Sequence, residues 1–380
     1  MPDNRPIYLD CNATTPIDPR VREVMLHYLD VEYGNAGSRT HVYGQAAAKG
    51  VKRARNQIAA VVDAAPEEIV FTSGATEANN LAILGLTDYG RRTGKRHIIS
   101  TEIEHKAVLE PLKLLEQQGF EIELVPPTLG GCVDPSDIGG RLRDDTLLVS
   151  VMHVNNETGV IQPLNAICRE LAQTEAFFHV DAAQGFGKEL TQLTDARVDM
   201  ISVSSHKVHG PCGIGSLIVR RQRNVQRALS PRQVGGNQER GLRSGTLPTF
   251  LICGFGHAAE LAVQEYSSRR NRWQELGEQF RQALAGLPVR IHGVTEERLP
   301  NTCSFSLARI DSEAVLLALR EVVALATGSA CTSSRMEPSH VLRAMYPKDT
   351  TADTACRASW CHLTGDLPVE HIRTALRTLL

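Results

Sequence analysis

Short apolar runs alternate with amphipathic segments over most of the chain. Two segments, Gln45–Val62 and Asn165–Gln173, place apolar residues at helical spacing. Five apolar runs of four to six residues are typical of buried strands: His97–Ser100, Thr146–Val151, Phe177–Val180, Met200–Val203 and Ser216–Val219. An order of strand, helix and strand at this spacing predicts crossover connections. The pattern therefore predicts an α/β fold with a mainly parallel sheet.

The pattern changes after about Phe250. A long polar helix is predicted over Ala259–Leu284, and shorter strands are predicted over Arg290–His292 and Thr302–Ser306. Helical segments then continue toward the C-terminus. The strand-like residues Ile7–Leu9 are expected to pack against this region. We interpret the region as a second, smaller α+β domain.

Length and composition agree with two globular domains. The chain has 380 residues, of which 42% are hydrophobic and 22% are charged. It is too long for one ordinary core and too apolar for disorder. We expect a large domain over residues 16–259 and a small domain made of residues 1–15 and 260–380. The net charge of −2 argues against direct nucleic-acid binding by a basic surface.

The N-terminal segment and the cysteines are typical of a cytoplasmic protein. Residues Met1–Pro6 are polar, and no stretch is apolar over the length of a membrane helix. The nine cysteines are odd in number and include no C-x-x-C pair, which argues against a disulfide scaffold and a cysteine-paired zinc site. We expect reduced thiols, no metal and no membrane contact.

Two buried strands are followed by residues that carry charge. Lys207, beside His206, follows one strand, and a desolvated lysine can form a Schiff base with a carbonyl. Asp181 ends another strand, and a buried acid needs a cationic partner such as a protonated pyridine nitrogen of pyridoxal phosphate. Gln184 would then donate to the cofactor's phenolate oxygen. A solvated loop lysine and a helix-capping aspartate are the alternatives.

A segment of small residues, Phe71–Glu77, joins an apolar strand to a helix that begins near Glu77. Backbone N–H groups at such a helix start bind phosphate, although a plain Ser/Thr cap has the same sequence. His105 follows another strand and could stack on a planar cofactor, or lie on the surface. The stretch Gly254–Ala259 matches a loose dinucleotide fingerprint, but we interpret it as close helix packing.

Taken together, these residues resemble those of the fold-type I pyridoxal-phosphate enzymes. Within them the chain is similar to the class V aminotransferase branch and its cysteine desulfurases of the IscS/NifS type. The resemblance runs nearly end to end and is carried by Tyr8–Pro16, Gly34–Ser38, Phe71–Glu77, Met152–Glu157, the Asp181 group, Ser205–Lys207 and Arg240–Thr246. It implies a large domain with a mainly parallel seven-stranded sheet and a smaller α+β domain.

The resemblance also implies roles for individual residues. Lys207 resembles the lysine that binds the cofactor and moves the substrate proton, Asp181 the partner of the pyridinium nitrogen, and His105 the residue stacked on the ring. The remaining residues contact the ring oxygen (Asn156, Gln184) and the phosphate (Ala75, Thr76, Ser204, His206). Thr246 resembles a phosphate contact donated by the second subunit of a homodimer.

Two residues of the second half indicate the reaction. Cys331 lies in the small-residue segment Thr327–Ser333, which in the family delivers sulfur, although a chance buried cysteine is the alternative. Arg357, helped by Asn35, resembles the residue that binds the substrate carboxylate, and a structural salt bridge is the alternative. The resemblance implies that Cys331 takes sulfur from L-cysteine, keeps it as a persulfide and passes it to an acceptor protein.

The acceptor and the pocket details stay open. An iron–sulfur scaffold, a tRNA thiolation enzyme or a DndA-like DNA phosphorothioation system are the acceptors that the resemblance implies. An aminotransferase, a selenocysteine lyase and a sulfur-relay protein without turnover are the alternative functions. Cys11 stands where Tyr or His is frequent in the family, and Ser359–His362 departs from the usual Ser-Phe/Leu-Gly pattern. Cys356 adjoins Arg357.

Overall fold

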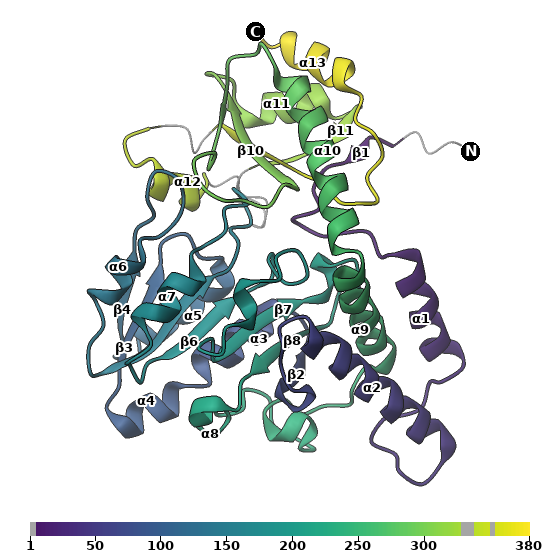
Figure 1. The fold of residues 1–380 in the computed structure, drawn as a ribbon, viewed down its shortest axis with the longest axis vertical. Coiled ribbons are helices and arrows are strands. Elements are labelled where there is room, and N and C mark those ends of the chain that lie inside the picture. The colour runs from purple at the N-terminus through teal and green to yellow at the C-terminus, as the bar shows by residue number, and fades with distance from the viewer. Residues whose placement is uncertain (1–4, 328–337, 350–353) are drawn as a thin grey trace.

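The computed structural model describes residues 5–327, 338–349 and 354–380. In Figure 1 a large sheet with its helices forms the lower part of the molecule, and a smaller sheet lies above it. Two consecutive helices, α9 (Thr249–Gln264) and α10 (Tyr266–Leu284), connect the two parts. In the described part of the chain, no helix is long and apolar enough to cross a bilayer.

The large sheet has seven strands in the order β2-β8-β7-β6-β5-β3-β4. Only β8 runs antiparallel to its neighbours, so the sheet is mainly parallel, as predicted. The strands are β2 (Ile69–Thr72), β3 (His97–Thr101), β4 (Glu121–Val125), β5 (Thr146–Met152), β6 (Phe177–Asp181), β7 (Met200–Ser204) and β8 (Gly215–Val219). All five predicted strands are present. Every residue of these five is buried, which explains why they are apolar runs without alternation.

Helices cover both faces of the large sheet. One core contains side chains of α3 (Ala75–Leu84), α5 (Lys106–Glu116) and α8 (Val225–Ala228). The core on the opposite face contains side chains of α1 (Pro19–Asp30), α2 (Val42–Ala60), α6 (Pro135–Gly139), α7 (Leu164–Glu170) and α9. The short α4 (Thr87–Thr93) follows α3. Single 3-10 turns occur at Pro66–Glu68, Gln192–Thr194, Ser205–Lys207, Gln222–Asn224 and Gln238–Gly241.

The glycines of α9 allow close helix contact. A Cβ atom on Gly256 would lie 2.5 Å from Cα of Ala54 in α2, and one on Gly254 would lie 2.6 Å from Cγ of Met25 in α1. The stretch Gly254–Ala259 therefore lies inside a packed helix and does not form a turn after a strand. The interpretation as a packing motif, and not a dinucleotide fingerprint, is confirmed.

The single long helix predicted over Ala259–Leu284 is wrong. The helix breaks at Glu265, which has φ −104° and ψ 13° and whose carboxylate accepts hydrogen bonds from Arg20 and Arg269. The break separates two environments. Side chains of α9 belong to the core of the large sheet, whereas Trp273 and other side chains of α10 belong to the core of the small sheet. A periodic pattern does not show which core a helix faces.

The smaller part contains a four-stranded antiparallel sheet in the order β12-β13-β10-β9. Its strands are β9 (Val289–Ile291), β10 (Thr302–Leu307), β12 (Ala326–Thr327) and β13 (Ala355–Ser359). Helices α10, α11 (Ser312–Leu319) and α13 (Val369–Arg377) share its core. β1 (Ile7–Tyr8) pairs with β11 (Val323–Ala324), so the N-terminal strand joins C-terminal elements. α12 (His340–Met345) packs on Ile103 and Met152 beside the large sheet.

Candidate active site

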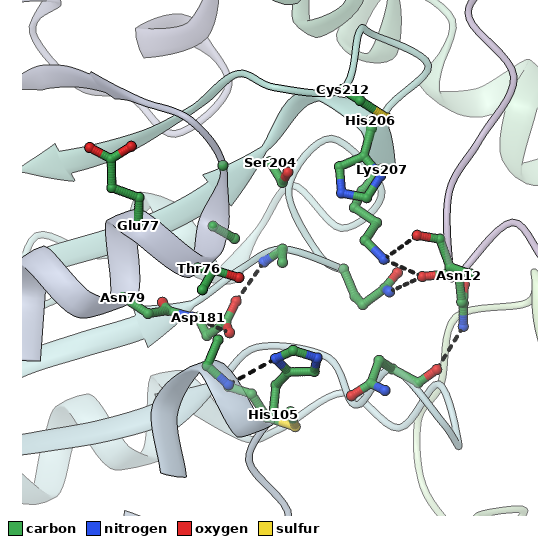
Figure 2. A pocket seen from close by; sticks show the side chains of 18 of the residues that line it. Asn12, Thr76, Glu77, Asn79, His105, Asp181, Ser204, His206, Lys207 and Cys212 are labelled. Atoms are coloured by element: carbon green, nitrogen blue, oxygen red, sulfur yellow. Dashed lines mark hydrogen bonds between the residues drawn. The ribbon is translucent and has the colours of Figure 1, made fainter. Parts of the chain in front are cut away.

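A cavity of about 420 Å³ opens where β6, β7 and the turn before α3 end (Figure 2). Its volume is in the range of ordinary small-ligand sites, and its position at the carboxyl ends of parallel strands is where open α/β sheets bind ligands. Nine of the residues expected from the sequence line it: Ala75, Thr76, His105, Asn156, Asp181, Gln184, Ser204, His206 and Lys207. The fold therefore brings together residues from five separate strand ends and turns.

The start of α3 forms one wall of the cavity. The first N–H groups of a helix have no partner within the helix and attract an anion. At this wall the backbone of Gly215 lies close to those of Val203 and Gly74. A Cβ atom on Gly215 would lie 2.4 Å from the Val203 carbonyl oxygen and 2.7 Å from Cα of Gly74. Glu77 forms an ion pair with Arg243 at 2.8 Å, and its carboxylate also accepts a hydrogen bond from the Ser73 N–H at 2.6 Å. Its carboxylate therefore does not cancel the attraction for an anion.

Lys207 projects into the cavity from the 3-10 turn directly after β7. Its Nζ donates hydrogen bonds to the carbonyls of Asn12 and Ala13, the latter at 2.8 Å. The side chain of Asn12 is itself fixed, since its amide donates to Thr302 Oγ1 at 2.9 Å and to the Asn156 carbonyl at 3.1 Å. The backbone oxygens of Asn12 and Ala13 hold the amine of Lys207 at the cavity.

Asp181 ends β6 with its carboxylate at the cavity (Figure 2). One oxygen accepts from the Ala183 N–H at 3.0 Å within a turn, and no helix begins there, so the helix-capping alternative is wrong. The other accepts from Nδ2 of Asn79 at 2.8 Å. The sequence analysis missed Asn79, a fully buried amide on α3. The feature that could have identified Asn79 is its place as a polar residue on the apolar face of a helix that begins at a predicted phosphate site.

His105 is the N-cap of α5, where its Nδ1 accepts the N–H of Ala107 at 3.1 Å. Burial lowers the pKa of His105, and the charge of Lys207 lowers it further, against the opposing effect of Asp181. The imidazole is therefore neutral at pH 7, with its proton on Nε2. Burial, together with Lys207 and Lys188, also lowers the pKa of His206 to about 4. Two flat, uncharged rings thus line the cavity.

Gln184 connects the cavity to a buried lysine that the sequence analysis missed. Its Nε2 donates to the Asn12 carbonyl at 2.8 Å, and its Oε1 accepts from Nζ of Lys188 at 3.1 Å. Burial lowers the pKa of Lys188 to about 7, and the charge of Lys207 acts in the same direction. Its hydrogen-bond partner Gln184 is only four residues away, but the burial of Lys188 and the effect of the Lys207 charge depend on segments that only folding brings together.

Three expected site residues do not line the cavity. Asn35 is exposed and accepts the Gly37 N–H at 2.8 Å, and Thr246 is exposed. Arg357 is fully buried in β13, where it forms an ion pair with Asp10 at 2.6 Å and donates to the Asn156 carbonyl at 3.1 Å. The structural salt bridge considered from the sequence is thus present. Cys331 lies outside the described residues.

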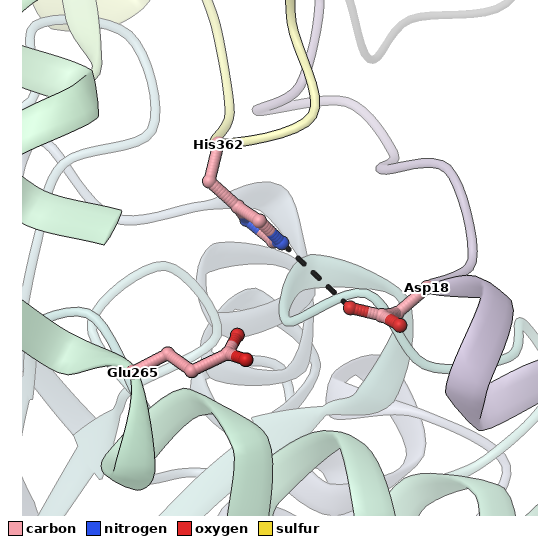
Figure 3. A group of neighbouring side chains, drawn as sticks. All are labelled: Asp18, Glu265 and His362. Atoms are coloured by element: carbon pink, nitrogen blue, oxygen red, sulfur yellow. Dashed lines mark ion pairs between the residues drawn. The ribbon is translucent and has the colours of Figure 1, made fainter. Parts of the chain in front are cut away.

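A second group of titratable side chains lies apart from the cavity, at the junction of α1, α10 and the segment after β13. Figure 3 shows Asp18, Glu265 and His362 near one another. Both carboxylates are paired with arginines: Asp18 with Arg20 at 2.7 Å, and Glu265 with Arg269 at 3.0 Å. The Arg20 hydrogen bonds hold the pKa of Asp18 well below its usual range. The arginines balance the two acids, so we interpret the group as an ion-pair network.

Comparisons with known proteins identify the family. The model of the aminotransferase class-V family matches residues 7–370. Cysteine desulfurase IscS of Vibrio cholerae is 44% identical over 381 aligned positions, which cover 98% of this chain and 93% of that protein. The structure of DndA from Streptomyces lividans is 45% identical with a TM-score of 0.81, covering 92% of this chain and 98% of that one. The structure of SspA in complex with cysteine is 34% identical with a TM-score of 0.84, covering 94% and 100%.

These matches span almost the whole chain, and the cavity contains the lysine and the aspartate that the sequence analysis singled out. Pyridoxal 5′-phosphate is the cofactor of class V aminotransferases and cysteine desulfurases. Cysteine desulfurases are among its curated relatives, and the chain belongs to the aminotransferase class-V family of pyridoxal-phosphate enzymes.

Proposed function

We propose that this protein is a cysteine desulfurase that converts L-cysteine to L-alanine and holds the sulfur as a persulfide on Cys331. One observation carries the proposal. A single cavity unites Lys207, Asp181, His105 and a helix start suited to phosphate, in a chain that is 44% identical to a cysteine desulfurase over 98% of its length. The Thr327–Ser333 segment, with its cysteine, supports sulfur chemistry over simple transamination.

The cavity fits pyridoxal phosphate. Asp181 is a buried carboxylate suited to a pyridinium nitrogen, and Lys207 offers an amine to an aldehyde. The phosphate would be held by Ala75, Thr76, Ser204 and His206, and the ring oxygen by Asn156 and Gln184. When bound, the cofactor supplies an electron sink for the charge left by loss of the substrate's α-proton.

The chain's own residues then do three things. Lys207 Nζ, released from the carbonyls of Asn12 and Ala13, takes up the α-proton and returns it to the product. His105, neutral and fixed by the Ala107 N–H, offers a flat face to the ring. Asn79 orients the carboxylate of Asp181, which would hold the pyridinium nitrogen of the cofactor.

Cys331 is proposed as the nucleophile. Its thiolate attacks the sulfur of the bound cysteine, the carbon–sulfur bond breaks, and the sulfur stays on Cys331 as a persulfide while alanine leaves. A thiol of an acceptor protein then removes the outer sulfur. The acceptors we consider belong to iron–sulfur cluster assembly, tRNA thiolation or DNA phosphorothioation. The DndA structure, at 45% identity, supports the last of these.

Substrate binding by Arg357, with help from Asn35, is part of the proposal. Arg357 does not line the cavity itself, but it donates a hydrogen bond to the carbonyl of Asn156, which does. To bind a carboxylate it must exchange Asp10 for the substrate. We also propose a cytoplasmic homodimer in which Thr246 completes the neighbouring subunit's phosphate site, without membrane or direct nucleic-acid contact.

The first test measures both products in one assay. The purified protein, loaded with pyridoxal phosphate, is incubated with L-cysteine and a reductant, and alanine and sulfide are quantified together. We expect equal amounts of both, and a loss of about a thousandfold or more in the variant Cys331→Ser. Cys132→Ser is the matched control, because Cys132 lies away from the cavity and contacts the Ile161 carbonyl at 3.3 Å.

The other outcomes separate the alternatives. Transfer of the amino group to a keto acid without sulfide would identify an aminotransferase. Activity restricted to selenocysteine would identify a selenocysteine lyase. Full sulfide release by Cys331→Ser would keep the reaction and reject the nucleophile. A protein that fails to bind the cofactor would support a sulfur-relay role.

A further inference from the structure

Two cysteines from opposite ends of the chain lie side by side. Cys11 follows β1, and Cys361 follows β13. The two segments are joined where Asp10 bridges Ser359 and the Cys11 N–H donates to the Ser359 carbonyl at 3.1 Å. The two thiols lie close enough to influence each other's pKa, and only 2% and 3% of these residues are exposed. Both are positions at which the chain departs from the usual family pattern.

The surroundings of the two thiols differ. Cys361 Sγ accepts a hydrogen bond from Thr364 Oγ1 at 3.6 Å, a contact that Cys11 lacks and that favours the thiolate of Cys361. The neighbouring Cys11 thiol lowers the pKa of Cys361 to about 7, and Cys361, together with burial, raises the pKa of Cys11. The buried amine of Lys188 acts on both sulfurs with a positive charge. Cys361 is therefore the more nucleophilic of the two sulfurs.

We propose that Cys11 and Cys361 form a peroxide-reactive dithiol site that closes to an intramolecular disulfide. The Cys361 thiolate attacks one oxygen of hydrogen peroxide, the O–O bond breaks, and the departing hydroxide takes a proton to become water. Cys361 is then a sulfenic acid. The Cys11 sulfur attacks the Cys361 sulfur, a second water leaves, and the S–S bond forms. Two thiols lose two electrons, and the peroxide gains them.

Burial selects the oxidant. Both sulfurs are almost completely enclosed, so a molecule of the size of hydrogen peroxide can reach them far more readily than a tripeptide disulfide such as oxidised glutathione. The site also adjoins the cavity, because Asn12 directly follows Cys11 and its carbonyl accepts hydrogen bonds from Lys207 and Gln184. The proposal does not rest on desulfurase activity.

The test is disulfide mapping in a Cys331→Ser background, which removes the proposed nucleophile from the reaction. The protein is treated with hydrogen peroxide, quenched in acid, alkylated and digested with trypsin. Cleavage after arginine and lysine places Cys11 within residues 1–20, Cys361 within residues 358–373 and Cys356 in a separate peptide, residues 349–357. We expect a linked peptide that joins Cys11 to Cys361 and disappears after reduction with dithiothreitol.

Three variants sharpen the test. Cys11→Ala and Cys361→Ala should each abolish the linked peptide. Cys303→Ala, which removes another buried cysteine in β10, should retain it. Circular dichroism establishes that each variant is folded. Oxidised glutathione at equal concentration should form the disulfide at least about tenfold more slowly than peroxide.

The proposal would be overturned by two results in folded protein. One is that Cys361 remains alkylated at peroxide concentrations that already oxidise the partly exposed Cys132. The other is that Cys361 is found linked to Cys356 or to glutathione and not to Cys11. Either result would show that the two buried cysteines are a packing arrangement without redox chemistry.

Discussion

At the scale of single residues, the candidate site depends on buried polar partners as much as on the reactive groups. Asp181 has two hydrogen-bond donors, and one of them, Asn79, is enclosed by α3 and the sheet. A carboxylate left without its partner in such a place costs free energy and also loses its orientation. The same reasoning applies to Asn12, whose backbone oxygen receives Lys207 and Gln184.

Replacing Asn79 by alanine tests this dependence. We expect Asn79→Ala to lower the free energy of unfolding by about 1–3 kcal/mol, because the buried Asp181 oxygen loses its partner. We also expect weaker cofactor binding. Asn80→Ala is the matched control, since Asn80 is the next residue on α3 and its amide donates only to the Thr76 carbonyl of its own helix. Urea unfolding and cofactor titration of both variants make the comparison. Equal losses in the two variants would contradict it.

At the scale of elements, apolar runs predicted the strands well. β3, β5, β6, β7 and β8 are buried along their whole length, so composition alone marks them. β4, with mostly half-exposed or exposed residues at the edge of the sheet, was missed. The helix break at Glu265 was missed because it depends on contacts with Arg20 and Arg269. Local spacing predicts an element but not where its packing partner changes.

The contact between α2 and α9 provides a test at this scale. Gly256→Ala places a Cβ atom 2.5 Å from Cα of Ala54, a backbone atom that cannot rotate away. We expect a net loss of about 1–3 kcal/mol in the free energy of unfolding, although alanine favours helix by up to about 1 kcal/mol. The control is Gly365→Ala, because a Cβ atom added there would have nothing within 4 Å apart from its chain neighbours. Thermal and urea unfolding measure both, and a stabilised Gly256→Ala would reject the packing argument.

At the scale of the whole molecule, a buried acid links stability to pH. Glu104 is completely buried, with one oxygen accepting from the Met152 N–H and from Thr101 Oγ1, both at 2.8 Å. Burial raises the pKa of Glu104 from 4.5 to about 8. Between these values the folded protein keeps a proton that the unfolded chain has lost. This group therefore makes the folded state less stable as the pH rises, by about 1.4 kcal/mol per pH unit, up to its folded pKa.

Glu104→Gln removes this titration while keeping the shape of the neutral side chain. We expect the free energy of unfolding of the native protein to fall relative to that of Glu104→Gln by a few kcal/mol from pH 5 to pH 8. Urea unfolding at several pH values measures the difference. The exposed Glu110→Gln should leave the pH profile unchanged. A difference that grows toward acid pH would show that Glu104 is ionised in the folded state.

The proposed dimer is tested by mixing two inactive variants. Lys207→Ala lacks the amine, and Thr246→Ala lacks the proposed contact to the other subunit. If Thr246 acts across the interface, a mixed dimer contains one intact site, and random mixing restores activity in about a quarter of all sites. Refolding the variants together and separately, followed by an activity assay, makes the measurement. No recovery in mixed dimers would place Thr246 in the site of its own subunit, or outside any site.

The sequence alone determined the α/β class, the strands of the sheet centre and the positions of Lys207 and Asp181. Buried strands must be apolar, and charged residues at their ends stand out against them. Only the tertiary structure decided which polar groups meet. Asp10 and Arg357 pair across 347 residues, and Cys11 lies beside Cys361. Such contacts leave no periodic signal in either segment, because each partner is selected by a neighbour that only folding brings within reach.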